Sequence, residues 1–486
     1  MRIAFAVSEV EDLVKTGGLA DVGKSLPIAL KELGHDVRIV MPLYKDISFA
    51  KLGFTEKLPE ACPAQVVYYQ GRTYHFNVKS FELHGITVYL VDHPEYFHRD
   101  GLYSDNYDAF ADNGQRFAFF SQSVLYTLSG VGFIPDILHS NDWHTALTPY
   151  FLKHCANAEL KQEFADTRSI LTIHNAAFQG VFHRQDVPIL IDDPAIEHFA
   201  HGEYLNFLQT GLACCDHITT VSPNYANELL TDLGSHGLST LLQSRPQSVT
   251  GILNGCDYSQ WDPRTDVLIE HHFNIDDLSG KKLCKRELQE YAQLPVDEHV
   301  PLLGMVCRLT EQKGFGYILP ILERLLQHRL QLVIIGTGDP AVVDQLSQLA
   351  AAFHTKFSFI NGFSNKYAHW VEAGADFFLM PSQFEPCGLN QMYSLAYGTL
   401  PIVRAVGGLK DTVTDLESMP TESTGFAFQP PQAEALLNCI RRALLCYHEA
   451  PQDFLKMQHR AMQTRFTWQE AAQQYQSLYT RVIDHG

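Results

Sequence analysis

The chain has 486 residues, which is too long for one typical domain, so we expect two or three. Its 55 acidic residues outnumber its 36 Lys and Arg residues and give a formal net charge of −19. Because an acidic chain is a poor binder of nucleic acid, we expect no nucleic-acid partner. An anionic substrate would therefore have to meet a local cluster of cations.

The ten cysteines are scattered along the chain, with one adjacent pair and no CxxC motif. This spacing indicates neither a disulfide framework nor a zinc site, and it fits reduced thiols in a cytosol. No run approaches the roughly 20 apolar residues that span a bilayer, and the short apolar start of the chain is too brief for a signal peptide. We therefore expect a cytoplasmic protein without a membrane partner.

The first apolar run, residues 2–8, predicts a strand, and the helical spacing of leucines and valines over residues 19–33 predicts a helix. Gly17 and Gly18 therefore lie in a strand-to-helix turn. Backbone N–H groups lack partners there, and the helix dipole favours anions. With Lys15 beside the glycines, the turn suits a phosphate at the carboxyl edge of a sheet. An ordinary tight turn before a helix is the alternative.

Short apolar runs then alternate with helical patterns, which predicts parallel sheets covered on both faces. In the first half, the further predicted strands are residues 37–40, 86–91, 134–138, 169–173 and 217–221, with a helix around residues 115–125. In the second half they are residues 302–307, 331–335, 357–360, 377–380 and 401–403, with helices around residues 317–326 and 389–397. Each half is predicted to be one Rossmann-like domain.

The domain boundary is expected near residue 250, although no Pro- or Ser-rich linker marks it. We predict an N-terminal domain over residues 1–250 and a C-terminal domain over residues 251–464. Residues 465–486 contain a final amphipathic helix. No short-period repeat or low-complexity segment interrupts this organisation.

The second half carries its own candidate anion site. Arg308 ends a predicted strand, and Lys313 follows five residues later, just before a helix. Two long cations at the carboxyl end of a strand suit a pyrophosphate, whereas a solvated loop with two surface charges is the simpler alternative. Gly407 and Gly408 repeat the design of paired glycines before a helix and are a further candidate for phosphate contacts. Glu385 lies in a turn that leads into another helix, where a carboxylate often only stabilises the helix dipole.

Histidines form the remaining candidates. His174 ends a predicted strand and could hydrogen-bond a sugar hydroxyl, although an exposed or capping histidine is the common alternative. The cluster of His139, Asp142 and His144 is the one group that could suggest a metal, but its spacing matches no standard zinc pattern. The chain also has no Asp-x-Asp triplet. We therefore expect no metal and no cofactor, with fixed cations neutralising a bound anion.

Several strings together resemble one family. KTGGLADV from residue 15, HSNDWH from residue 139, TIHN from residue 172, RLTEQKG from residue 308, FEPCGL from residue 384 and GGLKDT from residue 407 are similar to motifs of the bacterial glycogen synthase and starch synthase family. The resemblance implies a glycosyltransferase-B fold, in which two Rossmann-like domains face each other across a deep cleft. The last helix would cross back to the first domain. It also implies transfer of glucose from ADP-glucose to the non-reducing end of an α-1,4-glucan such as glycogen, with retention of the anomeric configuration.

The resemblance further implies which residues act. Catalytic roles would belong to Lys15, His174, Arg308, Lys313 and Glu385. Donor or nucleotide contacts would come from Gly17, Gly18, Asp21, Asp142, Asn254, Cys387, Gly388, Leu389, Gly407 and Gly408, besides Lys15, Arg308 and Lys313. Phe363 is a candidate for stacking on adenine. Related transferases carry a second glutamate eight residues after the first, and here that position is Tyr393, as in this branch of glycogen synthases.

Two alternatives stay open at this level. One is a related retaining glucosyltransferase that uses UDP-glucose or another acceptor, because the choice of base depends on the shape of the pocket. The other is a non-catalytic glycan-binding relative, against which the joint presence of five candidate catalytic residues argues.

Overall fold

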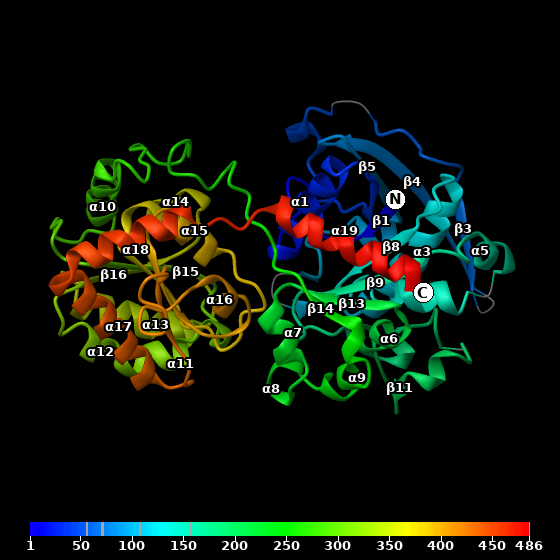
Figure 1. Cartoon of the computed structure of the whole chain (residues 1–486). Coiled ribbons are helices and arrows are strands. Elements are labelled where there is room, and N and C mark those ends of the chain that lie inside the picture. Colours follow the sequence, from blue (N-terminus) through cyan, green and yellow to red (C-terminus); the bar gives the residue numbers. More distant parts are fainter. Residues whose placement is uncertain (55–56, 70–71, 106–107, 156, 192, 486) are drawn as a thin grey trace. The chain divides into compact units, whose positions relative to one another are not determined.

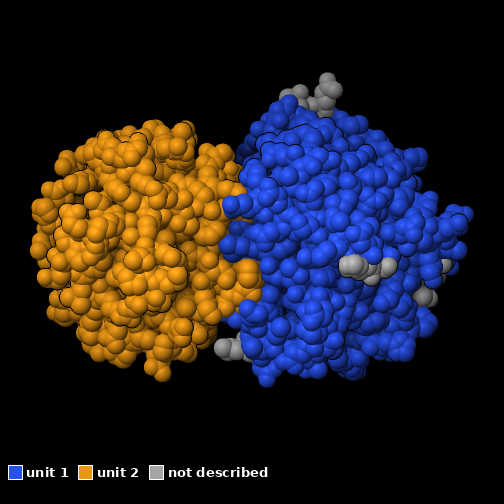
Figure 2. Space-filling view, in the orientation of Figure 1, with its two compact units in different colours: residues 1–221, 226–254, 468–486 blue, residues 222–225, 255–467 orange. Residues whose placement is uncertain are grey.

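The computed structural model describes residues 1–54, 57–69, 72–105, 108–155, 157–191 and 193–485. The chain divides into two compact units, coloured separately in Figure 2. Unit 1 comprises Met1–Val221, Ala226–Asn254 and Trp468–Gly486, and unit 2 comprises Ser222–Tyr225 and Gly255–Thr467. The main crossing between units thus follows Asn254, four residues beyond the expected boundary, and the final helix belongs to unit 1.

Unit 1 is built on a nine-stranded sheet (Figure 1). Its strands, in spatial order, are β14 (Val249–Gly251), β13 (His217–Thr220), β9 (Arg168–Ile173), β8 (Ile137–Asn141), β1 (Arg2–Ala6), β2 (Asp36–Pro42), β5 (Ile86–Asp92), β4 (Arg72–Leu83) and β3 (Gln65–Tyr69). The seven strands from β14 to β5 pair in parallel, whereas β4 and β3 are antiparallel. The sequence-based prediction missed this antiparallel hairpin, because only part of β4 alternates between buried and exposed residues.

Helices cover this sheet. The main ones are α1 (Gly18–Glu32), α3 (Asn113–Gly130), α4 (Leu147–Lys153), α6 (Phe207–Cys214) and α19 (Trp468–His485). The helix α19, red in Figure 1, packs beside α1, so that residues from the two ends of the chain share one core. Shorter helices are α2 (Pro94–Phe97), α5 (Ala158–Glu163), α7 (Pro223–Leu229), α8 (Asp232–Ser235) and α9 (Ser239–Ser244), and a small sheet joins β10 (Val181–His183), β12 (Tyr204–Asn206) and β11 (Ala200–His201).

Unit 2 holds a six-stranded sheet whose strands all pair in parallel. In spatial order they are β17 (Phe357–Asn361), β16 (Gln331–Gly336), β15 (Leu302–Val306), β18 (Phe377–Met380), β19 (Leu400–Arg404) and β20 (Phe426–Phe428). This is the Rossmann order, which reverses direction between β15 and β18. The helices are α10 (Ser279–Tyr291), α11 (Phe315–Ile318), α12 (Leu322–Leu325), α13 (Pro340–Ala352), α14 (Asn365–Gly374), α15 (Asn390–Ala396), α16 (Gly407–Thr412), α17 (Ala433–Glu449) and α18 (Pro451–Gln463).

Prolines cause two elements to differ from their predicted bounds. The helix expected over residues 317–326 is split into α11 and α12 by a 3₁₀ turn, Leu319–Ile321, since Pro320 has no N–H for a helical hydrogen bond. The strand expected over residues 134–138 begins only at Ile137, because Pro135 cannot donate to the ladder. The shift carries β8 onward to Asn141, directly before Asp142.

Candidate functional site

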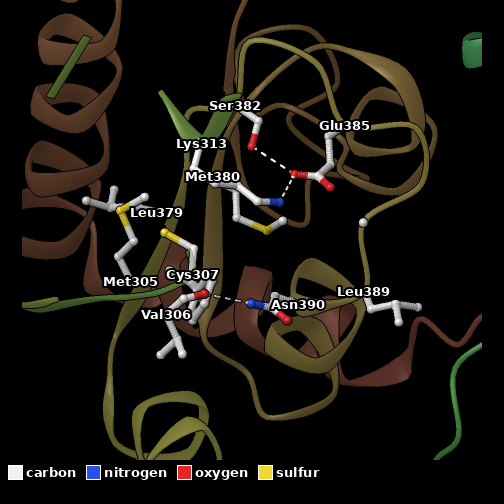
Figure 3. A pocket seen from close by; sticks show the side chains of 12 residues that line it. Met305, Val306, Cys307, Lys313, Leu379, Met380, Ser382, Glu385, Leu389 and Asn390 are labelled. Carbon is white, nitrogen blue, oxygen red and sulfur yellow. Dashed lines mark hydrogen bonds and ion pairs between the residues drawn. The ribbon is translucent and has the colours of Figure 1, made fainter. Parts of the chain in front are cut away.

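A pocket opens in unit 2 at the point where the strand order reverses (Figure 3). Parallel sheets bind ligands at such points, outside the carboxyl ends of the strands. The cavity of about 120 Å³ is lined by Met305, Val306, Cys307, Lys313, Phe378, Leu379, Met380, Ser382, Glu385, Gly388, Leu389 and Asn390. Most of these residues belong to the ends of β15 and β18 and to the segments that follow them.

Lys313 and Glu385 form an ion pair at this pocket. The distance between Nζ of Lys313 and Oε2 of Glu385 is 2.7 Å, and the hydroxyl of Ser382 donates to the same oxygen at 2.9 Å. Both charged side chains are largely buried. Gly314 brings Lys313 into place, because it has a φ of +86° and a Cβ there would lie 2.0 Å from the carbonyl oxygen of Pro381. The pocket therefore presents a cation and a carboxylate that are held against each other.

The paired glycines that begin α16 pack against the backbone of the Glu385 turn. A Cβ on Gly407 would lie 2.0 Å from the carbonyl oxygen of Glu385, and one on Gly408 would lie 2.1 Å from that of Cys387. The N–H of Gly408 donates to the carbonyls of Glu385 and Pro386. Within the protein, these two glycines therefore seat the Glu385 turn. Phosphate contacts by Gly407 and Gly408 stay a prediction.

Three other predicted residues of the donor site lie outside this pocket. Arg308 lies two residues beyond the end of β15 and is exposed, and its side chain has no hydrogen bond or ion pair with any residue that the structure describes. Phe363 follows β17 at the same edge of the sheet and is 68% exposed, so its ring is available for stacking. Asn254, the last residue of the middle segment of unit 1, is buried, and its Oδ1 has no partner among the described residues.

Unit 1 has a second candidate site where its own strand order reverses, between β1 and β8. Nζ of Lys15 lies 2.7 Å from Oδ1 of Asp21 and 2.9 Å from Oε1 of Glu11. Burial opposes the charged form of Lys15, but these two carboxylates outweigh it and raise the pKa of the lysine. Burial raises the pKa of Asp21 to about 6, against the attraction of Lys15. Two of the three ammonium donors of Lys15 are thus occupied, and a third is available for a ligand.

Gly17 and Gly18 lie beside this lysine. Gly17 precedes α1 with an extended backbone, and a Cβ there would meet nothing within 4 Å. Nothing in the packing of unit 1 therefore requires glycine at this position. What the glycine provides is open room beside an exposed backbone at a helix N-terminus, as an anion site needs.

Asp142 and His174 are brought together at the same edge. Oδ1 of Asp142 accepts the backbone N–H of His174 at 2.7 Å, and the ring Nε2 of His174 lies 2.9 Å from Oδ1 of Asn141. Burial raises the pKa of Asp142 to about 7, although the backbone N–H groups of His174 and Asn175 oppose the rise. Burial lowers the pKa of His174 to about 3, so its imidazole is neutral near pH 7. A neutral imidazole and a carboxyl group suit hydrogen bonding to sugar hydroxyls.

His139 belongs to the core, and both of its ring nitrogens have partners within the protein. Its Nδ1 lies 2.7 Å from the hydroxyl of Tyr479 on α19, and its Nε2 lies 2.6 Å from that of Thr172. No group of three or more His, Cys, Asp or Glu side chains in the described part of the chain is arranged to hold a metal ion. Within the same residues, no helix combines the length and apolar content needed to cross a bilayer.

Sequence reasoning missed several polar residues of these sites. Glu11 has a local signal, since it stands four residues before Lys15. Ser382 has a similar signal, since it stands three residues before Glu385, whereas Asn390 has none, because its contact with Val306 depends on the pairing of β15 with β18. Glu9 is buried beneath the Lys15 turn and is also revealed by the structure alone.

Two known families match this chain, one over the part that contains the nine-stranded sheet and one over the part that contains the six-stranded sheet. Residues 2–244 match the family described as "Starch synthase catalytic domain", and residues 288–460 match the family described as "Glycosyl transferases group 1". Together the two matches cover both candidate sites.

Individual relatives extend over nearly the full length. The chain is 49% identical to a glycogen synthase of Aeromonas hydrophila over 99% of this chain and 98% of the relative. It is 48% identical to one of Vibrio cholerae over 98% of both chains. The catalytic domain of starch synthase IV from Arabidopsis thaliana, bound to ADP and acarbose, superposes with a TM-score of 0.87 at 28% identity, covering 100% of this chain and 99% of the other. Sucrose-phosphate synthase from Thermosynechococcus elongatus shares the fold at 18% identity, with a TM-score of 0.59 and full coverage of both chains.

Proposed function

Because the chain belongs to the family of glycogen and starch synthases, we propose that it transfers glucose from ADP-glucose to the non-reducing end of an α-1,4-glucan, with retention of the anomeric configuration. The glycosyltransferase activity and the glycosyltransferase-B fold follow from membership of the family. The nucleotide, the stereochemical outcome and the roles of individual residues are the proposal.

One observation carries the proposal. The pocket of unit 2 holds a buried carboxylate paired with a cation, and an unpartnered guanidinium follows the adjacent strand end. When the glycosidic bond to the donor breaks, negative charge grows on the diphosphate and positive charge grows on the sugar carbon. Arg308 and Lys313 are assigned to the diphosphate, and Glu385 is assigned to the sugar. Fixed charges of this kind stabilise the transition state without reorganising.

Unit 1 contributes the groups around its own strand reversal. Lys15 and the exposed backbone of Gly17 are assigned to the diphosphate. His174 and Asp142 are assigned to sugar hydroxyls, because His174 is half-buried, Asp142 is buried, and both are hydrogen-bonded in a fixed arrangement. No cofactor is proposed, since the cationic side chains supply the charge that a metal ion would otherwise provide.

The donor is proposed to be ADP-glucose instead of UDP-glucose. The Arabidopsis relative is bound to ADP and to acarbose, and Phe363 offers an exposed ring on which a purine can stack. The reaction is placed in the cytoplasm, which the ten free cysteines favour.

The decisive experiment compares the two donors with the purified full chain and glycogen as acceptor. The release of ADP from ADP-glucose should exceed the release of UDP from UDP-glucose by at least about tenfold in kcat/KM. The product should be digested by an enzyme specific for α-1,4-linked glucose. Preference for UDP-glucose would overturn the donor assignment, and transfer to water alone would overturn the acceptor assignment.

A further inference from the structure

Glu9 is a buried carboxylate that the roles above do not use. It lies three residues after β1 and is 3% exposed. Its Oε2 accepts the backbone N–H of Thr16 at 2.5 Å, and its Oε1 accepts the hydroxyls of Thr16 and Tyr103, each at 2.7 Å. Among the residues that the structure describes, no Lys or Arg forms an ion pair with it. Three hydrogen bonds are therefore what offsets the cost of burying this group.

These hydrogen bonds hold the turn that carries the anion site. Thr16 stands between Lys15 and Gly17, and both of its donors point at Glu9. The turn cannot rotate about Thr16 without breaking two hydrogen bonds to a buried carboxylate, which are stronger than hydrogen bonds between neutral groups. Glu9 thereby fixes the direction of the Lys15 side chain and of the Gly17 backbone.

Glu9 is itself fixed from the opposite side. A Cβ on Gly23 of α1 would lie 2.3 Å from the carbonyl oxygen of Glu9, so the helix touches this backbone directly. The hydroxyl of Tyr103 also lies within hydrogen-bond distance of that of Ser8, at 2.9 Å, so a segment distant in sequence is held at the same point. Glu9 is therefore held in a fixed position, and the turn is hydrogen-bonded to its carboxylate.

We propose that Glu9 is a positioning residue for the donor diphosphate: it holds the turn of Lys15, Thr16 and Gly17 in the arrangement that binds this anion. The inference rests on the proposed function, because it assigns the turn to the diphosphate. Glu9 does not touch the donor. Its effect reaches the donor through Thr16.

The main variant is Glu9→Gln. The amide keeps the shape but has only one oxygen, whereas the two donors of Thr16 use both oxygens of Glu9. One donor of Thr16 then faces an NH₂ group, and the turn is released. The KM for ADP-glucose and the Kd for ADP should rise by about fivefold or more, and the KM for glycogen should stay within about twofold.

Asp193→Asn is the matched control. Asp193 is also buried, and its two oxygens likewise accept a backbone N–H, of Ala195 at 2.9 Å, and a hydroxyl, of Tyr150 on α4 at 2.5 Å, but it lies between β10 and β11. This change should affect thermal stability as Glu9→Gln does, and it should leave the KM for ADP-glucose unchanged. If both variants lose stability but only Glu9→Gln raises the KM for ADP-glucose, the effect on KM comes from positioning and not from a general loss of packing.

Thr16→Val is the second variant and decides the matter if Glu9→Gln does not fold. It removes only the hydroxyl and should raise the Kd for ADP by roughly threefold. When it is combined with Glu9→Gln, the double variant should be less impaired than the product of the two single effects. A folded Glu9→Gln or Thr16→Val with wild-type Kd for ADP would overturn the proposal. Inactivity of the wild type with ADP-glucose would instead overturn the proposed function, and the Kd values would still test Glu9.

Discussion

Oε2 of Glu385 lies 2.7 Å from Nζ of Lys313, although 72 residues separate them in the chain. The two side chains meet because β15 and β18 are neighbours in the sheet, and each residue lies just beyond one of these strands. A buried ion pair of this kind acts as a unit, since removal of one partner leaves the other uncompensated. This coupling shapes the first prediction.

Glu385→Gln should lower kcat by more than about tenfold and change the KM for the donor less, because the lost charge matters most when the sugar carbon becomes positive. Lys313→Ala should cost about 2–4 kcal/mol of transition-state stabilisation. The double variant should lose less than the sum of the two, because the partners share one interaction. Steady-state kinetics of the three variants measure this coupling. Strict additivity, or wild-type turnover of Glu385→Gln, would show that the pair does not act in the reaction.

Arg308→Ala should reduce kcat/KM by a factor corresponding to about 2–4 kcal/mol, with little change in melting temperature, because the exposed side chain makes no contact that holds the fold. Arg286→Ala on α10 is the matched control, since Arg286 is likewise exposed but lies on a helix away from the strand ends. Equal activity of the two variants would remove Arg308 from the phosphate site.

Asp142→Asn should make the protein more stable and less active. Asn keeps the acceptor for the N–H of His174 and tolerates the φ of +53° at this position. It also removes a carboxyl group whose pKa burial raises from 3.8 to about 7. Since that group costs folding energy only when it is ionised, the variant should be more stable by roughly 2–4 kcal/mol at pH 8 and by nothing below pH 4. Denaturant melts at both pH values test this, and a lower kcat should accompany the gain.

Unit 1 should lose stability in mild acid through buried histidines. Burial lowers the pKa of His139 and of His174 from 6.5 to about 3, so the unfolded chain binds protons first as the pH falls. Each histidine then lowers the free energy of unfolding by about 1.4 kcal/mol for every pH unit that the pH falls between pH 6.5 and 3. Asp142 acts in the opposite direction between pH 7 and 4, so Asp142→Asn should steepen the loss. His174→Gln should flatten it, and an unchanged slope in that variant would contradict the assignment.

Chelation should leave transfer intact. Fixed cations are proposed to neutralise the diphosphate, so activity after exhaustive EDTA treatment should remain within about twofold of the untreated enzyme. Complete loss of activity, restored specifically by Mg²⁺ or Mn²⁺, would require a metal site that involves residues other than the ones assigned above. The same assay without chelator, but with each metal added, serves as the control.

Features whose residues lie close together along the chain could be predicted from the amino-acid sequence alone. The apolar runs predict β1, β9, β15 and β18 nearly to the residue, because a strand buried on both faces needs an unbroken apolar stretch. The turn with Lys15 and Gly17 is just as local, since a strand followed directly by an amphipathic helix leaves only one place for it. Membership of the family rested on such contiguous strings.

Contacts between groups that are distant in sequence could be found only in the folded structure. The strand order sets the neighbours at each sheet edge, and it joins Lys313 to Glu385 and Glu9 to Tyr103 across 72 and 94 residues of sequence. It also gave Gly408 a packing role that its motif did not predict, because a helix and a turn approach too closely for any side chain. Contacts of this range depend on the path of the whole chain, whereas propensity and periodicity report only on short segments of it.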